Sequence, residues 1–140
     1  MASPVLLLLG VPESGTSALS DALVRAGAAL AGPPAGDPAG VSQHALAACG
    51  MRWDSLAPMP ARLARAPGLD AARAAIDVFL ERMPSDAPLL VAEPLATRIV
   101  AMWRERAEAA ERAFSTVLWL THPGSAAAAL ARRRQFAPEK

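Results

Sequence analysis

Two glycines, Gly10 and Gly15, bracket a short loop in the segment LLLLGVPESGTS near the start of the chain. The apolar run before Gly10 predicts a strand that is buried on both faces. The hydroxyl residues Thr16 and Ser17 open a predicted helix directly after Gly15. A glycine-rich turn lets backbone N–H groups point inward, and a helix N-terminus adds partial positive charge. This combination is the chemistry of an anion-binding loop.

The spacing of the two glycines matches the phosphate loop of nucleotide-hydrolysing proteins, but Thr16 stands where those proteins have lysine. That lysine contacts the outer phosphates, so its absence disfavours ATP or GTP hydrolysis. It also argues against a small-molecule kinase, which stays a third and weaker class of function. A strand–glycine–helix turn also serves purely structural roles. The loop alone therefore leaves two interpretations open, an anion site and a plain turn.

Length and composition indicate a single globular domain over residues 1–140. Hydrophobic residues make up 53% of the chain and charged residues 19%, which is too apolar for a disordered protein. The formal net charge is only +1, so nothing in the composition favours nucleic acid or a charged membrane surface as a partner.

The N-terminal apolar run lacks a preceding basic region, and no segment approaches the roughly 20 apolar residues of a membrane span. The single cysteine, Cys49, cannot form an internal disulfide and fits a reducing compartment as a small buried residue. We therefore expect a cytoplasmic protein without a membrane span.

Apolar runs alternate with helically periodic segments along the chain. The predicted strands are Val5–Leu9, Pro88–Ala92 and Ser115–Leu120, and the predicted helices are Thr16–Leu30, Val41–Cys49, Leu69–Met83, Leu95–Ala113 and Gly124–Arg134. This alternation predicts an α/β fold, with a P-loop-like three-layer parallel sheet and helices on both faces. Three strands make a small sheet, so either the domain is minimal or the chain is the front part of something larger. An incomplete sheet would offer an edge that could pair with another chain.

Helical spacing also predicts which side chains are buried. One stripe of the first helix and one of the third should face the core: Leu19, Leu23, Ala26 and Leu30, then Leu69, Ala72, Ile76, Phe79 and Leu80. The fourth helix should turn inward Ile99, Met102 and Trp103, and outward Arg104, Glu105, Glu108, Glu111 and Arg112. Trp53 and Trp119 are also interpreted as core residues, and Arg25 as solvent-facing.

The segment GVPESGTS, Gly10–Ser17, resembles the 5′-phosphosulfate loop of sulfotransferases, which runs Pro-Arg/Lys-Ser-Gly-Thr-Ser/Thr after the first strand. Three later segments resemble bacterial members of that family in the same order. Gly40–Asp54 is similar to the segment after the first helix, Leu89–Leu95 to a strand ending in Lys-Asp-Pro-Arg, and Val117–Phe136 to the strand and helix of the 3′-phosphate site.

The resemblance implies a sulfotransferase-type domain that uses 3′-phosphoadenosine-5′-phosphosulfate and transfers its sulfuryl group to a hydroxyl or amine. Members of the family usually extend well beyond this length, so the chain resembles their N-terminal half. The residues that the resemblance assigns to the donor nucleotide are Pro12, Glu13, Ser14, Gly15, Thr16, Ser17 and Thr121.

The departures from the family fall on its charged positions. Glu13 stands where the family has Arg or Lys, and Thr121 replaces the arginine of the 3′-phosphate site. Ala92 and Leu95 replace the Lys and Arg around the second strand end. Two like charges 4 Å apart repel by about 4 kcal/mol at an effective dielectric near 20, so Glu13 facing a sulfonate would be costly. Arg98, one helical turn after Leu95, could restore a cation.

These departures imply weak or lost catalysis and leave a second class of function open. In that alternative the chain is a pseudoenzyme, a non-catalytic interaction module that keeps the fold and associates with itself or with a protein partner. Glu93 and Glu13 could also share one strand-end cleft, and such a pair of carboxylates would suit a cation better than a phosphosulfate.

The two histidines carry little of this chemistry. His122 follows a predicted strand end, where it could contact an anion or act as a base, but capping of local backbone is favoured because no partner carboxylate is evident. His44 has no neighbours at metal-ligand spacing, so no metal site is expected.

Overall fold

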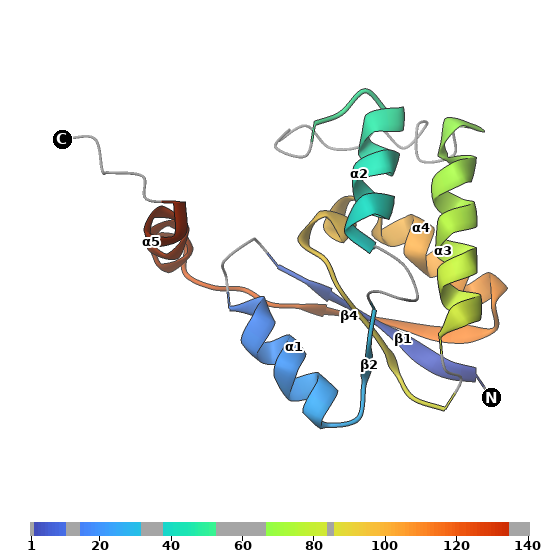
Figure 1. Ribbon diagram of the computed structural model, residues 1–140, viewed down its shortest axis with the longest axis horizontal. Coiled ribbons are helices and arrows are strands. Elements are labelled where there is room, and N and C mark those ends of the chain that lie inside the picture. The colour runs from blue at the N-terminus through green and yellow to red at the C-terminus, as the bar shows by residue number, and fades with distance from the viewer. Residues whose placement is uncertain (1, 11–14, 32–37, 53–66, 84–85, 135–140) are drawn as a thin grey trace.

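The computed structural model describes residues 2–10, 15–31, 38–52, 67–83 and 86–134. Within these residues the strands form one all-parallel sheet in the order β2-β3-β1-β4 (Figure 1). The strands are β1 (Ala2–Leu9), β2 (Ala29–Leu30), β3 (Leu89–Ala92) and β4 (Arg112–Leu118). The α/β class and the parallel sheet are confirmed, whereas the prediction of three strands was wrong because the sheet has four.

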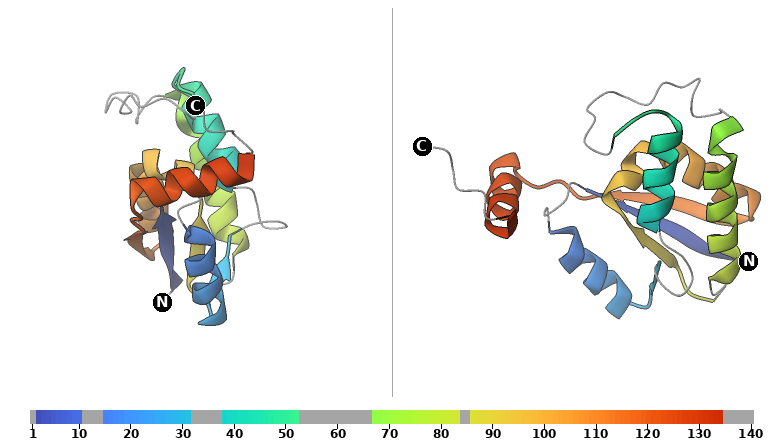
Figure 2. Two further views of the ribbon diagram at one scale, coloured as in Figure 1. Left: turned by 90° about the vertical axis from the view of Figure 1, so that its left-hand side faces the viewer. Right: turned by 45° about the horizontal axis from the view of Figure 1, so that its top comes forward.

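Helices cover both faces of this sheet, as the sequence predicted. Helix α1 lies on one face, and α2, α3 and α4 lie together on the other (Figure 1). The helices are α1 (Thr16–Arg25), α2 (Pro38–Ala48), α3 (Asp70–Arg82), α4 (Val100–Ala109) and α5 (Pro123–Arg134), with 3₁₀ turns η1 (Pro67–Leu69) and η2 (Pro94–Arg98). Helix α5 lies beyond the carboxyl end of β4, clear of the sheet and of the other helices (Figures 1 and 2).

The strand that sequence reasoning missed, β2, follows a glycine that ends α1 early. Gly27 adopts φ +103°, and the Ala28 N–H donates to Leu23 O at 3.0 Å, which is the pattern of a Schellman cap. The chain then turns back into the sheet, where the Ala29 N–H donates to Pro88 O at 2.8 Å. Pairing with β3 therefore decides the state of a segment that helical periodicity had assigned to the end of the first helix.

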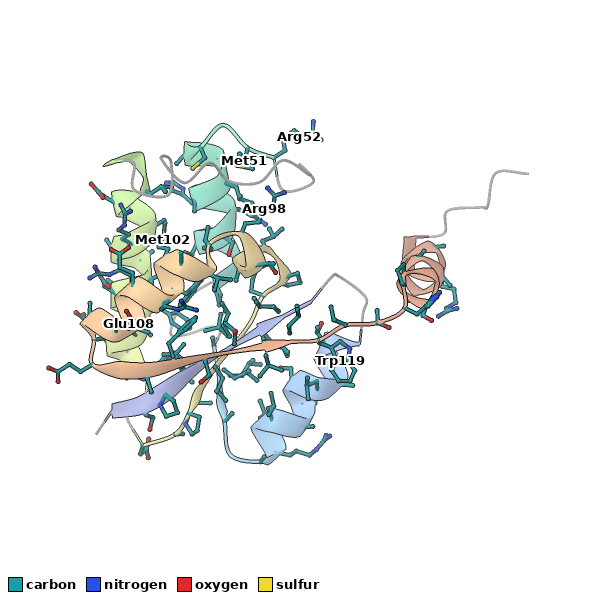
Figure 3. All side chains as sticks on the ribbon, turned by 180° about the vertical axis from the view of Figure 1, so that it is seen from behind. Met51, Arg52, Arg98, Met102, Glu108 and Trp119 are labelled. Carbon is teal, nitrogen blue, oxygen red and sulfur yellow. The ribbon has the colours of Figure 1, made fainter. Side chains whose placement is uncertain are left out.

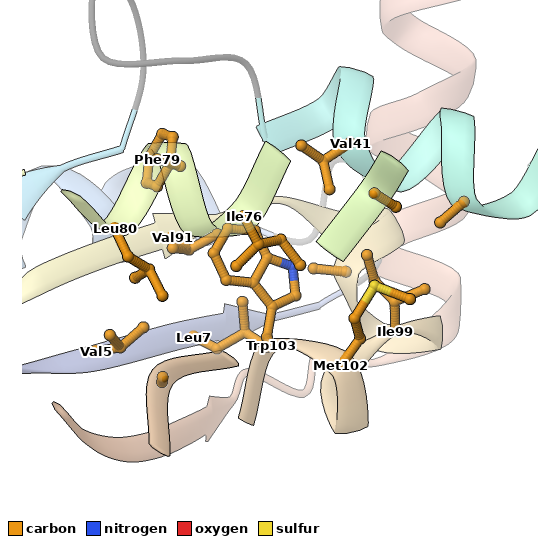
Figure 4. Close-up of a cluster of buried hydrophobic side chains, with 14 of the residues drawn as sticks. Val5, Leu7, Val41, Ile76, Phe79, Leu80, Val91, Ile99, Met102 and Trp103 are labelled. Carbon is orange, nitrogen blue, oxygen red and sulfur yellow. The ribbon is translucent and has the colours of Figure 1, made fainter. Parts of the chain in front are cut away.

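The main core lies between the sheet and the layer of α2, α3 and α4. Alternate residues of β1 and β3, including Leu7 and Val91, point into this layer and are fully buried. Trp103 on α4 is also fully buried and meets Phe79 on α3 edge-to-face, with ring centroids 5.9 Å apart (Figure 4). The predicted inward faces of the third and fourth helices are confirmed.

Other predictions of burial were wrong. Arg112, expected on the outer face of a helix, is the first residue of β4 and is buried. Its Nη2 donates to Leu80 O at 3.1 Å and to Met83 O at 3.2 Å, so it satisfies carbonyls at the end of α3. Trp119, expected in the core, is 39% exposed because it lies past the end of β4.

The predicted inner stripe of the first helix is only partly confirmed. Leu19 and Leu23 are half-buried, whereas Ala26 and Leu30 are exposed because the helix has already ended at Arg25. Arg25 itself faces solvent as predicted. Cys49 is half-buried rather than buried, and Trp53 lies outside the described residues.

Candidate anion-binding site at the carboxyl edge of the sheet

The strand order places a topological switch point between β1 and β3. These strands are neighbours, with Leu8 in register with Ala92. The chain leaves β1 through α1 on one face of the sheet, and it leaves β3 through η2 and α4 on the other (Figure 1). Parallel α/β sheets bind ligands in the crevice that such diverging connections open at the carboxyl edge. The candidate ligand-binding site therefore lies at the carboxyl ends of β1 and β3.

The first half of this site is the start of α1. Gly15 is the N-cap of the helix at φ +89°, a left-handed conformation that favours glycine, and none of the described side chains caps the helix. Thr16 is half-buried and Ser17 exposed. The first N–H groups of a helix have no intrahelical partners, so they are available to an anion. Residues 11–14, which include the predicted ligands Pro12, Glu13 and Ser14, lie outside the described residues.

The second half is Glu93, which follows β3 directly. Its side chain is buried, with only 6% of the residue exposed. Oε1 accepts the N–H of Leu95 at 3.0 Å and so caps η2, whereas the buried Oε2 has no hydrogen-bond partner among the described residues. A buried polar atom without a partner is costly. Oε2 is therefore available to a donor group of a ligand.

Sequence reasoning named Glu93 as one of two acidic residues at a strand end but did not identify its capping role. The signal was a glutamate before proline at the end of an apolar run. The residue before proline favours extended backbone, and an acidic side chain there can accept from the N–H groups of the next turn. Glu93 has that extended backbone, with φ −142° and ψ 114°. The proposed partner carboxylate, Glu13, lies outside the described residues.

Two arginines, Arg98 and Arg52, lie near the C-terminal ends of η2 and α2. Arg98 is the last residue of η2 and is half-buried, and Arg52 is exposed after α2 (Figure 3). Arg98 thus lies just beyond Leu95 on the segment that follows β3. Ala92 and Leu95 themselves bring no charge to the edge of the sheet.

The remaining predicted ligand, Thr121, is half-buried in the link between β4 and α5. β4 is the other neighbour of β1, and the Trp119 N–H donates to Leu9 O at 2.8 Å, so this link starts from the same edge of the sheet. His122 accepts the Gly124 N–H on Nδ1 at 3.1 Å. The prediction that His122 caps local backbone is therefore confirmed.

A separate cavity of about 200 Å³ lies between α3 and α4, away from the carboxyl ends of the strands. It is lined by Asp77, Leu80, Glu81, Arg106, Ala109 and Ala110. Arg106 donates to both oxygens of Asp77, at 2.6 and 2.9 Å, and this hydrogen-bonded carboxylate raises the pKa of the guanidinium above its ordinary value. The charge of Arg106 is thus already satisfied within the protein, and the cavity offers an external ligand little.

The described residues contain no group of three or more His, Cys, Asp and Glu side chains that could hold a metal ion. His44 is exposed on α2. Across the same part of the chain, every helix is too short or too polar to cross a membrane.

The fold and site define an all-parallel α/β protein with a glycine-led helix start and a buried carboxylate at its switch point. Comparison with protein-family models, with curated proteins and with solved structures found no match for the chain.

Proposed function

We propose that this chain is a sulfotransferase-type domain that binds 3′-phosphoadenosine-5′-phosphosulfate at the carboxyl edge of its sheet. The observation that carries the proposal is the buried Oε2 of Glu93, which has no hydrogen-bond partner among the described residues. Glu93 follows β3, the neighbour of the strand that leads to the N-terminus of α1. A helix start suits the sulfonate and phosphate oxygens of such a ligand. A carboxylate oxygen suits a group that carries a proton.

Each part of the site has a distinct role in this proposal. The amides and hydroxyls of Thr16 and Ser17 hold the sulfonate oxygens, and Gly15 sets the direction of those amides. The bound nucleotide supplies a sulfuryl group, which an acceptor hydroxyl or amine takes with release of the 3′,5′-bisphosphate. Glu93 Oε2 accepts the proton that the acceptor loses.

Nucleotide binding is expected to be stronger than catalysis. The family's cationic positions hold the uncharged residues Ala92, Leu95 and Thr121 in this chain, so they cannot stabilise the charge that develops on the leaving group. The loss of one stabilising donor typically lowers the catalytic rate by a factor of about 10²–10³. The second candidate function is a non-catalytic interaction module. The exposure of Leu118 and Leu120, at 60% and 78%, favours it because exposed apolar groups are typical of contact surfaces.

A thermal-shift titration with 3′-phosphoadenosine-5′-phosphate tests nucleotide binding. A ligand at 100 times its Kd stabilises a protein by about 2.7 kcal/mol, which raises the Tm of a domain of this size by several degrees. ATP and inorganic sulfate are the controls and should shift the Tm far less. The absence of a shift with any of these anions would overturn the proposal.

A matched pair of glycine variants locates the binding site. Gly15→Ala and Gly27→Ala both put a side chain at positive φ, +89° and +103°, so each should cost about 1–2 kcal/mol of stability. Only Gly15 starts α1, so only Gly15→Ala should reduce the nucleotide-dependent shift. Equal shifts in the two variants would exclude the α1 N-terminus from the site.

The proton-accepting role of Glu93 is tested by Glu93→Gln. The amide oxygen can keep the hydrogen bond to the Leu95 N–H, whereas the other position becomes a donor and can no longer take a proton. We expect an unchanged nucleotide shift and a loss of at least tenfold in any sulfuryl transfer, followed with radiolabelled donor and a panel of hydroxyl and amine acceptors. Unchanged transfer by the variant would remove Glu93 from the chemistry.

A further inference from the structure

Trp119 contacts both ends of the loop that joins β1 to α1. Its backbone N–H donates to the carbonyl oxygen of Leu9, the last residue of β1, at 2.8 Å. Its side chain reaches Gly15, the N-cap of α1, and the indole Nε1 lies 3.6 Å from the position that a Cβ would take on Gly15. Figure 3 shows Trp119 beside the start of α1 and the end of β4. One residue therefore lies against both the point where the loop leaves the sheet and the point where it enters the helix.

The alternation of side chains along β4 accounts for the direction of the indole. Thr116 is in register with Leu7, which points into the layer of α2, α3 and α4. Val117 is in register with Leu8 and therefore points to the opposite face of the sheet, on which α1 lies (Figure 1). Trp119, two residues after Val117, points to that same face. Its indole thus lies between the end of β4 and the first turn of α1.

The start of α1 lacks the local features that usually fix a helix N-terminus. None of the described side chains caps it, and its first turn contains no acidic residue. Gly15, at φ +89°, has no side chain that would restrict its backbone. Apart from its chain neighbours, the Trp119 indole is the only described group within 4 Å of the Cβ position of Gly15. Packing against a side chain from the end of β4 therefore takes the place of a local cap.

On the basis of the nucleotide binding proposed above, we propose that Trp119 is a positioning residue for the anion site, which holds the start of α1 in its binding conformation by packing against Gly15. The amides of Thr16 and Ser17 can bind one anion together only when the helix begins at a fixed point. A contact that fixes them beforehand raises affinity, because the ligand no longer has to order them. Without the indole, a helix start that is ordered in about one molecule in ten would raise the apparent Kd about tenfold.

Thermal-shift titration of three variants with 3′-phosphoadenosine-5′-phosphate tests this role. Each shift is measured from the variant's own ligand-free Tm, so that a general loss of stability does not count. Trp119→Ala should raise the apparent Kd for the bisphosphate about tenfold. Trp119→Phe should stay near the wild-type value, because an aromatic ring still packs against Gly15. The matched control is Leu118→Ala, which removes an exposed side chain from the opposite face of the same strand and should leave the Kd unchanged.

Hydrogen exchange in the ligand-free protein tests the contact itself. The Ala18 N–H donates to Gly15 O at 3.2 Å, so its exchange rate reports whether the helix start is formed. It should exchange severalfold faster in Trp119→Ala than in the wild type, and at the wild-type rate in Leu118→Ala.

Three results would each overturn the positioning role alone: an unchanged Ala18 exchange rate in Trp119→Ala, a full nucleotide shift in that variant, or a Trp119→Phe variant that binds as weakly as Trp119→Ala. A different result would overturn the nucleotide binding itself. If the wild-type chain shows no shift with the bisphosphate, the proposed function fails, and the role of Trp119 in binding fails with it.

Discussion

Replacing Trp103 with alanine is expected to lower the free energy of unfolding by about 3–5 kcal/mol, the usual cost of deleting a large buried aromatic side chain. Trp103 has no exposed surface and packs edge-to-face on Phe79 between α3 and α4 (Figure 4). Alanine would leave a cavity among Leu7, Ile76 and Met102, which belong to the same core. A domain of this size has a total stability of only about 5–15 kcal/mol, so the variant should be close to unfolding.

A second tryptophan provides the matched control. Trp119 is 39% exposed beyond the end of β4, so Trp119→Ala should cost about 1 kcal/mol or less. The Trp103→Phe variant adds a finer test. The buried Trp103 Nε1 has no hydrogen-bond partner among the described residues, so phenylalanine loses volume but no polar contact and should cost much less than alanine. Urea unfolding followed by circular dichroism measures all three, and equal effects at positions 103 and 119 would contradict the packing described.

The second large effect is expected for Arg112→Met, which should cost about 2–4 kcal/mol because two buried acceptors lose their charged donor. Arg112 Nη2 donates to Leu80 O and Met83 O and ties the end of α3 to the start of β4. Methionine keeps much of the volume of the side chain, so the loss reports the hydrogen bonds rather than a cavity.

Arg104→Met is the control for this substitution. Arg104 is exposed on α4, and its guanidinium lies 5.8 Å from the centroid of the Phe114 ring, so its removal should cost about 1 kcal/mol or less. Urea unfolding compares the two variants directly. Hydrogen exchange should also show faster opening at the end of α3 in the Arg112 variant only. If the two methionine variants were equally stable, the carbonyls of Leu80 and Met83 would not depend on Arg112.

The sequence predicted only those features of the candidate site that depend on residues close together along the chain. Gly10 and Gly15 around a short loop, followed by hydroxyl residues, were sufficient to place a helix start after the first strand. The sequence showed that Glu93 follows a strand, but not that one of its oxygens would be buried and unpartnered. The cap of Glu93 on the Leu95 N–H is local, but the burial of the residue depends on how β3 packs in the sheet, which is a tertiary property.

The sequence by itself determined the elements whose periodicity is strong and local. Continuous apolar runs predicted β1 and β3, and regular apolar spacing predicted α3 with its buried Ile76 and Phe79. These features persist because burying one face of an element requires that spacing regardless of its neighbours.

Only the tertiary structure decided the order of the described strands, the two-residue strand β2 and the burial of Arg112. Each depends on a partner far away in the chain: β2 exists because Ala29 and Ala31 donate to carbonyls around β3, and Arg112 is buried because α3 ends beside it. Local propensity cannot encode such a contact, since the hydrogen bonds that stabilise it form only when the sheet assembles.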